Sequence, residues 1–287
     1  MNPSKTARSR RRAAAGCRAA AASRAGCCAD AAISGGKRRR ATTIDSSNPP
    51  SSEISLEQIG YSWPTFDRLT QHLVKSIAPT NILDIGAGGG KYGRLLKQVV
   101  PDCRFTALEC DENTHPLLRE NGYDDIVSAV SDTLYERAGD TYDTVILGDV
   151  IEHMRHSHGR DLLEFLNYRS RYIIISTPEC MPMNGASFFE SHNSVWRPDS
   201  FTWHDYWAHQ QCGIMHFYLL RGHLDWHAPR LDSLVNSANA SNLFNTRTND
   251  GQDATDEKHR QPVNLTLHDS RYMEHVDGDQ YAVFRPM

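Results

Sequence analysis

The chain has 287 residues, 23% of them charged, and a formal net charge of −4 at pH 7. This length fits one ordinary domain with tails, and no apolar run approaches the roughly 18 residues that span a bilayer. The seven cysteines are irregularly spaced and form no CxxC pair, which argues against a disulfide framework and against a zinc knuckle. We therefore predict a cytoplasmic protein without a membrane partner.

The charge is divided unevenly along the chain. Residues 1–40 hold eleven of the 31 Lys and Arg residues and one acid, so the rest of the chain is near −14. An acidic body is a poor general nucleic-acid binder. Residues 1–60 are rich in Ala, Arg and Ser and cannot bury enough apolar surface to offset their ordering entropy. We predict a disordered basic tail and linker there; a transit peptide and a nuclear or nucleic-acid patch at Lys37–Arg40 are the alternatives.

Apolar patterning predicts alternating helices and strands over residues 61–287. A helix is expected from Ser62-Trp63-Pro64 to Pro79, others after residue 90 and at 116–120 and 160–166. Near-continuous apolar strands are expected at 81–85, 104–109, 125–127, 143–147 and 172–176. Such strands indicate a parallel sheet covered on both faces, and right-handed crossovers make it doubly wound.

The C-terminal part is predicted to add two antiparallel strands, Ile214–Leu219 and Gln280–Arg285. Residues 232–261 between them are rich in Asn and Asp, and we expect a mobile insertion there.

A glycine-rich turn, Gly86-Ala87-Gly88-Gly89-Gly90, follows the first strand and leads into a helix. Such a turn lets the backbone approach a ligand closely. A phosphate-binding P-loop needs Ser or Thr after Gly-Lys, but Tyr92 follows Lys91. The dinucleotide pattern GxGxxG fails when it is counted from Gly86 and matches only two residues too late, so an NAD oxidoreductase is not favoured.

Three segments in order resemble class I S-adenosyl-L-methionine (SAM)-dependent methyltransferases. They are Leu83–Gly90, Phe105–Glu109 and Tyr142–His153, and the last is similar to ubiquinone-type O-methyltransferases, which have a Glu-His turn after the fourth strand. The resemblance implies a Rossmann-like, mostly parallel seven-stranded sheet with one antiparallel strand. It also implies a cofactor site made by Asp84, Gly86, Gly88, Gly90, Glu109, Asp132 and Asp149.

Two of these acids have distinct expected roles. Asp84 would anchor the methionine end of SAM, and Glu109 would accept hydrogen bonds from both ribose hydroxyls, which suits a carboxylate. Asp132 is our choice for the adenine contact after the third strand, with Ser131 as the alternative.

Methyl transfer to a hydroxyl also needs a base that removes a proton, most often His. Glu152 and His153 follow the fourth strand and His192 follows the fifth, and in a doubly wound sheet both loops lie over the ligand crevice. We predict these three as catalytic, whereas His156 and His158 read as a solvated helix start. Three aromatic residues could either line a substrate pocket or pack the loop: Trp196, Phe201 and Trp203.

The predicted function is SAM-dependent methylation of a hydroxyl on a small molecule or glycan precursor, without a metal or a nucleic-acid partner. One alternative is a metal-dependent RNA 2′-O-methyltransferase, because Asp149, Glu152, His153 and His192 look like that family's ligand set; Asp149 stands where that family has Glu. Carboxylate and imidazole ligands would suit Mg or Mn. A non-catalytic SAM-binding protein is the other alternative.

Overall fold

The computed structural model describes residues 62–180, 191–225, 227–247, 257–276 and 279–284, with backbone alone from residue 272 onward. The expected basic tail and linker, residues 1–60, lies outside this part of the chain. Among the described residues, no helix is both long and apolar enough to cross a membrane.

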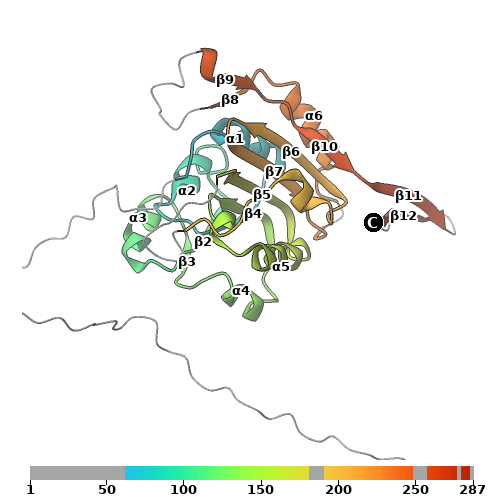
Figure 1. Ribbon diagram of the computed structural model, residues 1–287. Helices are drawn as coiled ribbons and strands as arrows, with labels where there is room; N and C mark the ends of the chain where they lie inside the picture. The colour runs from blue at the N-terminus through green and yellow to red at the C-terminus, as the bar shows by residue number, and fades with distance from the viewer. Residues whose placement is uncertain (1–61, 181–190, 226, 248–256, 277–278, 285–287) are drawn as a thin grey trace, which may run out of the picture. The chain divides into compact units, whose positions relative to one another are not determined.

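Within the described residues, the main sheet has eight strands in the order β10-β6-β7-β5-β4-β1-β2-β3 (Figure 1). They are β1 (Asn81–Ile85), β2 (Arg104–Leu108), β3 (Asp125–Val127), β4 (Tyr142–Gly148), β5 (Ser170–Pro178), β6 (Tyr206–Cys212), β7 (Met215–Arg221) and β10 (Thr266–Asp269). The first five are mutually parallel, whereas β7 runs antiparallel to β5 and β6, and β10 runs antiparallel to β6. The Rossmann-like, mostly parallel sheet expected from the sequence is confirmed, with one strand more than expected at its edge.

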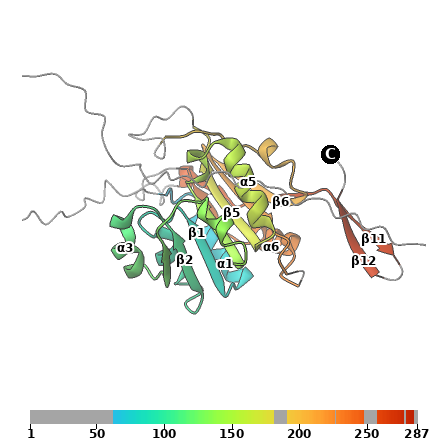
Figure 2. The ribbon, with the colours of Figure 1, turned by 90° about the horizontal axis from the view of Figure 1, so that it is seen from below.

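Helices cover both faces of the sheet (Figure 1). They are α1 (Asp67–Ile77), α2 (Lys91–Leu96), α3 (His115–Glu120), α4 (Thr133–Glu136), α5 (His156–Asn167) and α6 (Leu231–Asn239). Alternate strand residues point to opposite faces: in β1, Ile82 packs with the core of α1, α2 and α6, whereas Leu83 packs with the core of α4 and α5. Helix α5 lies along β5 (Figure 2).

Helix α1 begins later than the sequence predicted. The proposed start at Ser62-Trp63-Pro64 is wrong, because the first helical residue is Asp67. The Ser62 hydroxyl does not cap the helix but donates to the carbonyl of Gly148 at 3.0 Å, and the Trp63 N–H donates to the Asp149 carboxylate at 2.7 Å. These bonds hold Ser62 and Trp63 at the end of β4, and a turn at residues 64–66 then leads into α1.

The C-terminal strands also differ from the prediction. Ile214–Leu219 corresponds to β7, but the strand predicted at Gln280–Arg285 is β12 (Asp279–Phe284), which pairs with β11 (Arg271–Val276) in a separate two-stranded sheet. The neighbours of β7 are β5 and β6, and β6 was not predicted. Its residues YWAHQQC do not alternate cleanly, since both Tyr206 and Trp207 are buried.

The segment expected as an insertion, residues 232–261, contains regular structure where it is described. Helix α6 buries Leu231, Leu234, Val235 and Ala238 in the core. β8 (Phe244–Thr246) then pairs with β9 (Arg260–Pro262). The Asn- and Asp-rich composition did not indicate this amphipathic helix. Four apolar residues on one face are sufficient to pack a helix, even when its other positions are polar. Residues 248–256 lie outside the described part.

Candidate functional site

The glycine turn between β1 and α2 requires glycine for backbone reasons. Gly86, Gly88 and Gly90 all have positive φ angles, of 67°, 50° and 79°. At Gly86 a Cβ atom would also lie 2.4 Å from Cγ2 of Val150, which belongs to the loop after β4. The Gly86 N–H donates to the carbonyl of Leu108 at the end of β2. The turn therefore brings its backbone close to the ends of two neighbouring strands.

Glu109, directly after β2, is tied to this turn. One carboxylate oxygen accepts from the N–H of Gly88 and the other from the N–H of Asp111, both at 2.8 Å. A carboxylate offers about four lone-pair directions, so two remain for further donors. The side chain that the sequence assigns to the ribose is thus oriented by backbone and keeps acceptor capacity.

Asp84, in β1 just before the turn, is 1% exposed. Burial raises the pKa of this carboxyl to about 7, and the negative charge of Glu109 raises it further, whereas the hydrogen bond from Tyr123 opposes the shift. The Tyr123 hydroxyl donates to Asp84 and accepts from the N–H of Gly93 in α2 at 3.0 Å. Tyr123 was not predicted; it lies between α3 and β3 and carries no motif signal.

Asp149 follows β4 with a positive φ of 55°, which is uncommon for a non-glycine residue. One of its oxygens accepts from Trp63 N–H, while Oδ1 is buried and has no hydrogen-bond partner among the described residues. Burial raises the pKa of this carboxyl. A buried acceptor without a donor is costly, which favours a polar or cationic ligand at this position.

Lys91 places one positive charge near these acids. Its Nζ is 2.6 Å from Oδ1 of Asp67 and donates to the carbonyl of Trp63 at 2.6 Å. The attraction of Lys91 lowers the pKa values of both Asp84 and Asp149, although burial outweighs it. The strand ends are therefore rich in carboxylates and have one nearby ammonium group.

The structure brings the three predicted catalytic side chains together. Glu152 and His153 lie in the 3-10 turn η3 (Ile151–His153), and the rings of His153 and His192 meet edge to face at 4.9 Å. Glu152 is 1% exposed and accepts from the Thr177 hydroxyl of β5 at 2.9 Å. Burial, and then the charge of Asp149, raises its pKa well above the usual range.

Hydrogen bonds join the two loops that carry these side chains. The N–H groups of Asn193 and Ser194 donate to the carbonyl of Glu152 at 2.7 and 3.0 Å, and the Asn193 amide donates to the carbonyl of His153 at 2.8 Å. None of these contacts follows from a local pattern, because about 40 residues separate the partners.

Both imidazoles are oriented by backbone carbonyls. Nδ1 of His153 is 3.2 Å from the carbonyl of Ser191, and Nδ1 of His192 is 3.0 Å from the carbonyl of Cys180. Since a carbonyl only accepts, each neutral ring carries its proton on Nδ1 and its lone pair on Nε2. That lone pair can accept a proton or bind a metal.

Glu152, His153 and His192 could also hold a metal ion. One ligand atom of each lies within 4.8 Å of the others, and among the described residues this is the one such group of three or more His, Cys, Asp or Glu side chains. The carbonyl bonds at Nδ1 are the usual second contacts of metal-binding histidines. The donor set therefore fits a divalent ion, which the sequence indicated only as the alternative to a metal-free site.

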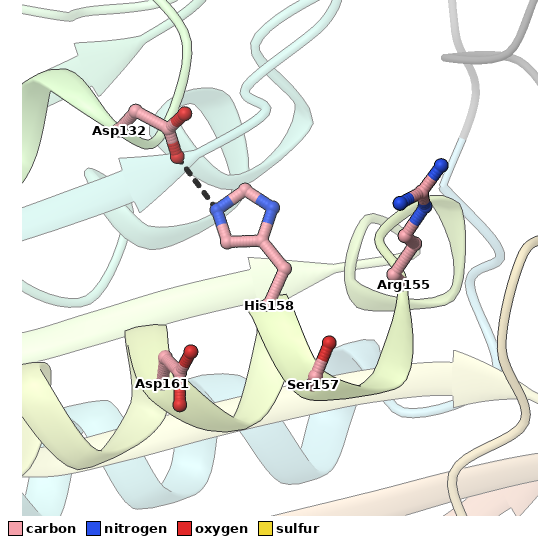
Figure 3. Close-up of a pocket in the computed structure, with 5 residues that line it drawn as sticks. All are labelled: Asp132, Arg155, Ser157, His158 and Asp161. Carbon is pink, nitrogen blue, oxygen red and sulfur yellow. Dashed lines mark ion pairs between the residues drawn. The ribbon is translucent and has the colours of Figure 1, made fainter.

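Asp132, the residue chosen for the adenine contact, pairs with a histidine of α5. Its carboxylate is mostly exposed and lies 2.6 Å from Nε2 of His158. Both line a surface hollow of about 520 Å³ with Arg155, Ser157 and Asp161 (Figure 3). Asp132 is the one predicted cofactor residue in this hollow, whereas the alternative, Ser131, is buried.

The aromatic residues after β5 divide into two groups. Trp196 and Phe201 are fully buried and pack in the core of α4 and α5, so they brace the loop instead of lining a pocket. His156 is exposed and stacks on Trp196 at 4.3 Å. Trp203 is half-buried, with Arg160 over its ring.

Comparisons with known proteins found similar solved structures but no match to a protein-family model or, by sequence, to a curated protein. The chain is similar to the plantazolicin methyltransferase BpumL in complex with SAH, with 13% identity, a TM-score of 0.43, and coverage of 55% of this chain and 85% of that one. A SAM-dependent methyltransferase from Archaeoglobus fulgidus gives 14% identity, a TM-score of 0.43, and coverage of 54% and 91%. The methyltransferase domain of bacterial-CtHen1-C gives 16% identity and a TM-score of 0.41, with coverage of 55% of this chain and 96% of that one.

Proposed function

We propose that the protein is a SAM-dependent methyltransferase. The observation that carries this proposal is the arrangement at the ends of β1, β2 and β4. A glycine turn with positive φ angles is tethered to Glu109, and the buried carboxyls of Asp84 and Asp149 stand beside it. SAM presents a ribose diol and two positive charges, an ammonium and a sulfonium, and these groups complement carboxylate acceptors.

The expected reaction moves a methyl group from the sulfonium to a hydroxyl oxygen, and the hydroxyl proton is released. The carbon–sulfur bond breaks as the carbon–oxygen bond forms, so the protein must align three atoms in a line. His192 and His153 supply the proton acceptors, because their Nδ1 protons are directed to backbone carbonyls. The Glu152 carboxyl lies beside this ring, with Oε1 4.0 Å from Nε2 of His153, so the imidazolium that forms favours the ionised form of Glu152.

We propose a small-molecule or glycan-precursor hydroxyl as the acceptor. The two imidazoles support an oxygen acceptor, since an amine that is already neutral needs no base of this kind. The acidic body supports an acceptor that is not a polyanion.

A second candidate is a metal-dependent methyltransferase of RNA 2′-hydroxyls, with a divalent ion on Glu152, His153 and His192. The convergence of their ligand atoms within 4.8 Å favours it. A bound ion would lower the pKa of the hydroxyl directly. Chelation separates the two: activity that survives a chelator supports the imidazole bases, whereas activity restored by Mg or Mn supports the metal.

The test is calorimetric binding of SAM to the full chain, followed by turnover against a metabolite extract. Mass detection would identify a product that has gained one CH₂ group. We expect SAM to bind at micromolar strength, about −8 kcal/mol. Binding of NADH without SAM would contradict the cofactor, and SAM binding without turnover on metabolites or RNA would favour a non-catalytic protein.

A further inference from the structure

A series of hydrogen-bonded polar side chains, with a buried histidine at its centre, joins the β6–β7 hairpin to the end of β5. Nε2 of His209 lies 3.0 Å from Nδ1 of His216, and Nε2 of His216 lies 2.9 Å from Oε2 of Glu179. His216 is 2% exposed. Because the Glu179 carboxylate only accepts, a neutral His216 carries its proton on Nε2 and accepts from His209 through Nδ1. Both hydrogen bonds, from His209 to His216 and from His216 to Glu179, therefore have their donors on the side away from Glu179.

Glu179 is held at two further points. Its other oxygen lies 2.5 Å from Nε of Arg197, and its N–H donates to the carbonyl of Ile214 at 2.7 Å. Interaction with His216 and Arg197 lowers the pKa of this carboxyl, so it is ionised at neutral pH and is a strong acceptor. The residue directly after β5 is thus fixed to the hairpin by both backbone and side chain.

The next residue, Cys180, contacts the predicted catalytic imidazole. Nδ1 of His192 lies 3.0 Å from the Cys180 carbonyl and 3.5 Å from its sulfur. The direction of this carbonyl decides which nitrogen of His192 carries the proton. A shift of the backbone at residues 179–180 would release Nδ1 and leave the ring free to adopt its other tautomer.

We propose that Glu179 and His216 are positioning residues for His192, which hold the Cys180 carbonyl so that the ring stays in the Nδ1–H tautomer. The proposal deepens and rests on the proposed function, in which Nε2 of His192 accepts the hydroxyl proton. Neither residue touches the substrate; both act through the backbone of Cys180. A buried imidazole is costly unless its ring nitrogens are paired, as those of His216 are here.

The experiment measures the tautomer of His192 by ¹⁵N NMR of the imidazole rings, with the full chain at a pH where the rings are neutral. A His192→Gln variant assigns the signal. In the wild type we expect one dominant form, Nδ1–H. In His216→Leu, which removes the donor to Glu179, the ratio of Nδ1–H to Nε2–H should fall by roughly fivefold, the scale of one lost hydrogen bond. His216→Gln keeps an N–H donor and should restore much of the ratio.

Controls separate positioning from loosening. His204→Leu removes another buried imidazole, which bonds Asn167 and makes no contact with the His209–His216–Glu179 series. This change should leave the tautomer ratio of His192 unchanged. If His216→Leu does not fold, Glu179→Gln gives the comparison, since it removes the charge and keeps the shape. An unchanged His192 ratio in a folded His216→Leu, or an equal change in His204→Leu, would overturn the proposal.

Calorimetry with SAM on the same samples keeps the two proposals apart. Retained SAM affinity together with the tautomer change supports both. If the wild type binds no SAM, the proposed function is contradicted, even if the tautomer ratio of His192 changes in His216→Leu as expected.

Discussion

Replacing Asp84 by Asn should stabilise the fold above neutral pH and weaken the cofactor site. The buried carboxyl has a pKa of about 7 in the folded protein against 3.8 for the free group, and burial is the main cause. The difference is about 3 units, and at roughly 1.4 kcal/mol per unit the cost of ionising Asp84 in the fold is about 4 kcal/mol. Asn resembles the protonated carboxyl and can still accept the Tyr123 hydroxyl, but it never ionises.

The sign follows from proton counts. Between pH about 4 and about 7 the folded state holds the Asp84 proton and the unfolded state has lost it, so stability falls as pH rises through this window. Below the window the group has no net effect, and above it the full cost is present. Asp84→Asn should therefore match the wild type near pH 4 and exceed its free energy of unfolding by up to about 4 kcal/mol near pH 8.

The assay is urea unfolding of both proteins at about pH 5 and about pH 8, with linear extrapolation. Asp102→Asn is the matched control, because Asp102 is exposed in the turn before β2. The same stability difference between Asp84→Asn and wild type at both pH values would refute the reasoning. Calorimetry tests the effect on the cofactor site: the SAM affinity of Asp84→Asn should be lower than that of the wild type by roughly 10- to 100-fold, which corresponds to the free energy of one charge-assisted hydrogen bond.

Three further changes test other parts of the site. Gly86→Ala should destabilise the protein by about 1–3 kcal/mol in urea unfolding, because φ is 67° and the new Cβ meets Val150; a neutral result would mean that the turn can relax. His192→Ala should keep SAM affinity within about threefold while turnover drops by roughly 100-fold or more, and unchanged turnover would remove its role as base. Deleting residues 1–50 should leave the melting temperature and SAM affinity unchanged, since this stretch is basic and lacks apolar periodicity; a melting temperature lowered by several degrees would show that it packs on the domain.

The parallel core and the strand-end turn were readable from the sequence because both are local. Five apolar strands alternating with helices predict the order of elements, and the structure places all five in one parallel array. The glycines at 86, 88 and 90 have backbone angles that other residues avoid. The requirement for glycine is local, so it can be inferred from the sequence without knowing which residues contact the turn. Which loops meet over the strand ends follows from the same topology, and Glu152, His153 and His192 do converge there.

Tertiary structure alone decided the start of α1, the neighbours of β7 and the supports of the site. For the start of α1 and the supports of the site, the deciding partner is distant along the chain: Ser62 bonds Gly148, 86 residues away, and Tyr123 bonds Asp84, 39 residues away. His216 reaches Glu179 across 37 residues, from a strand whose other residues are mostly apolar. A serine hydroxyl, a tyrosine hydroxyl or an imidazole can cap a helix, lie at the surface or form a buried hydrogen bond. Which of these it does depends on the partner that the fold brings next to it.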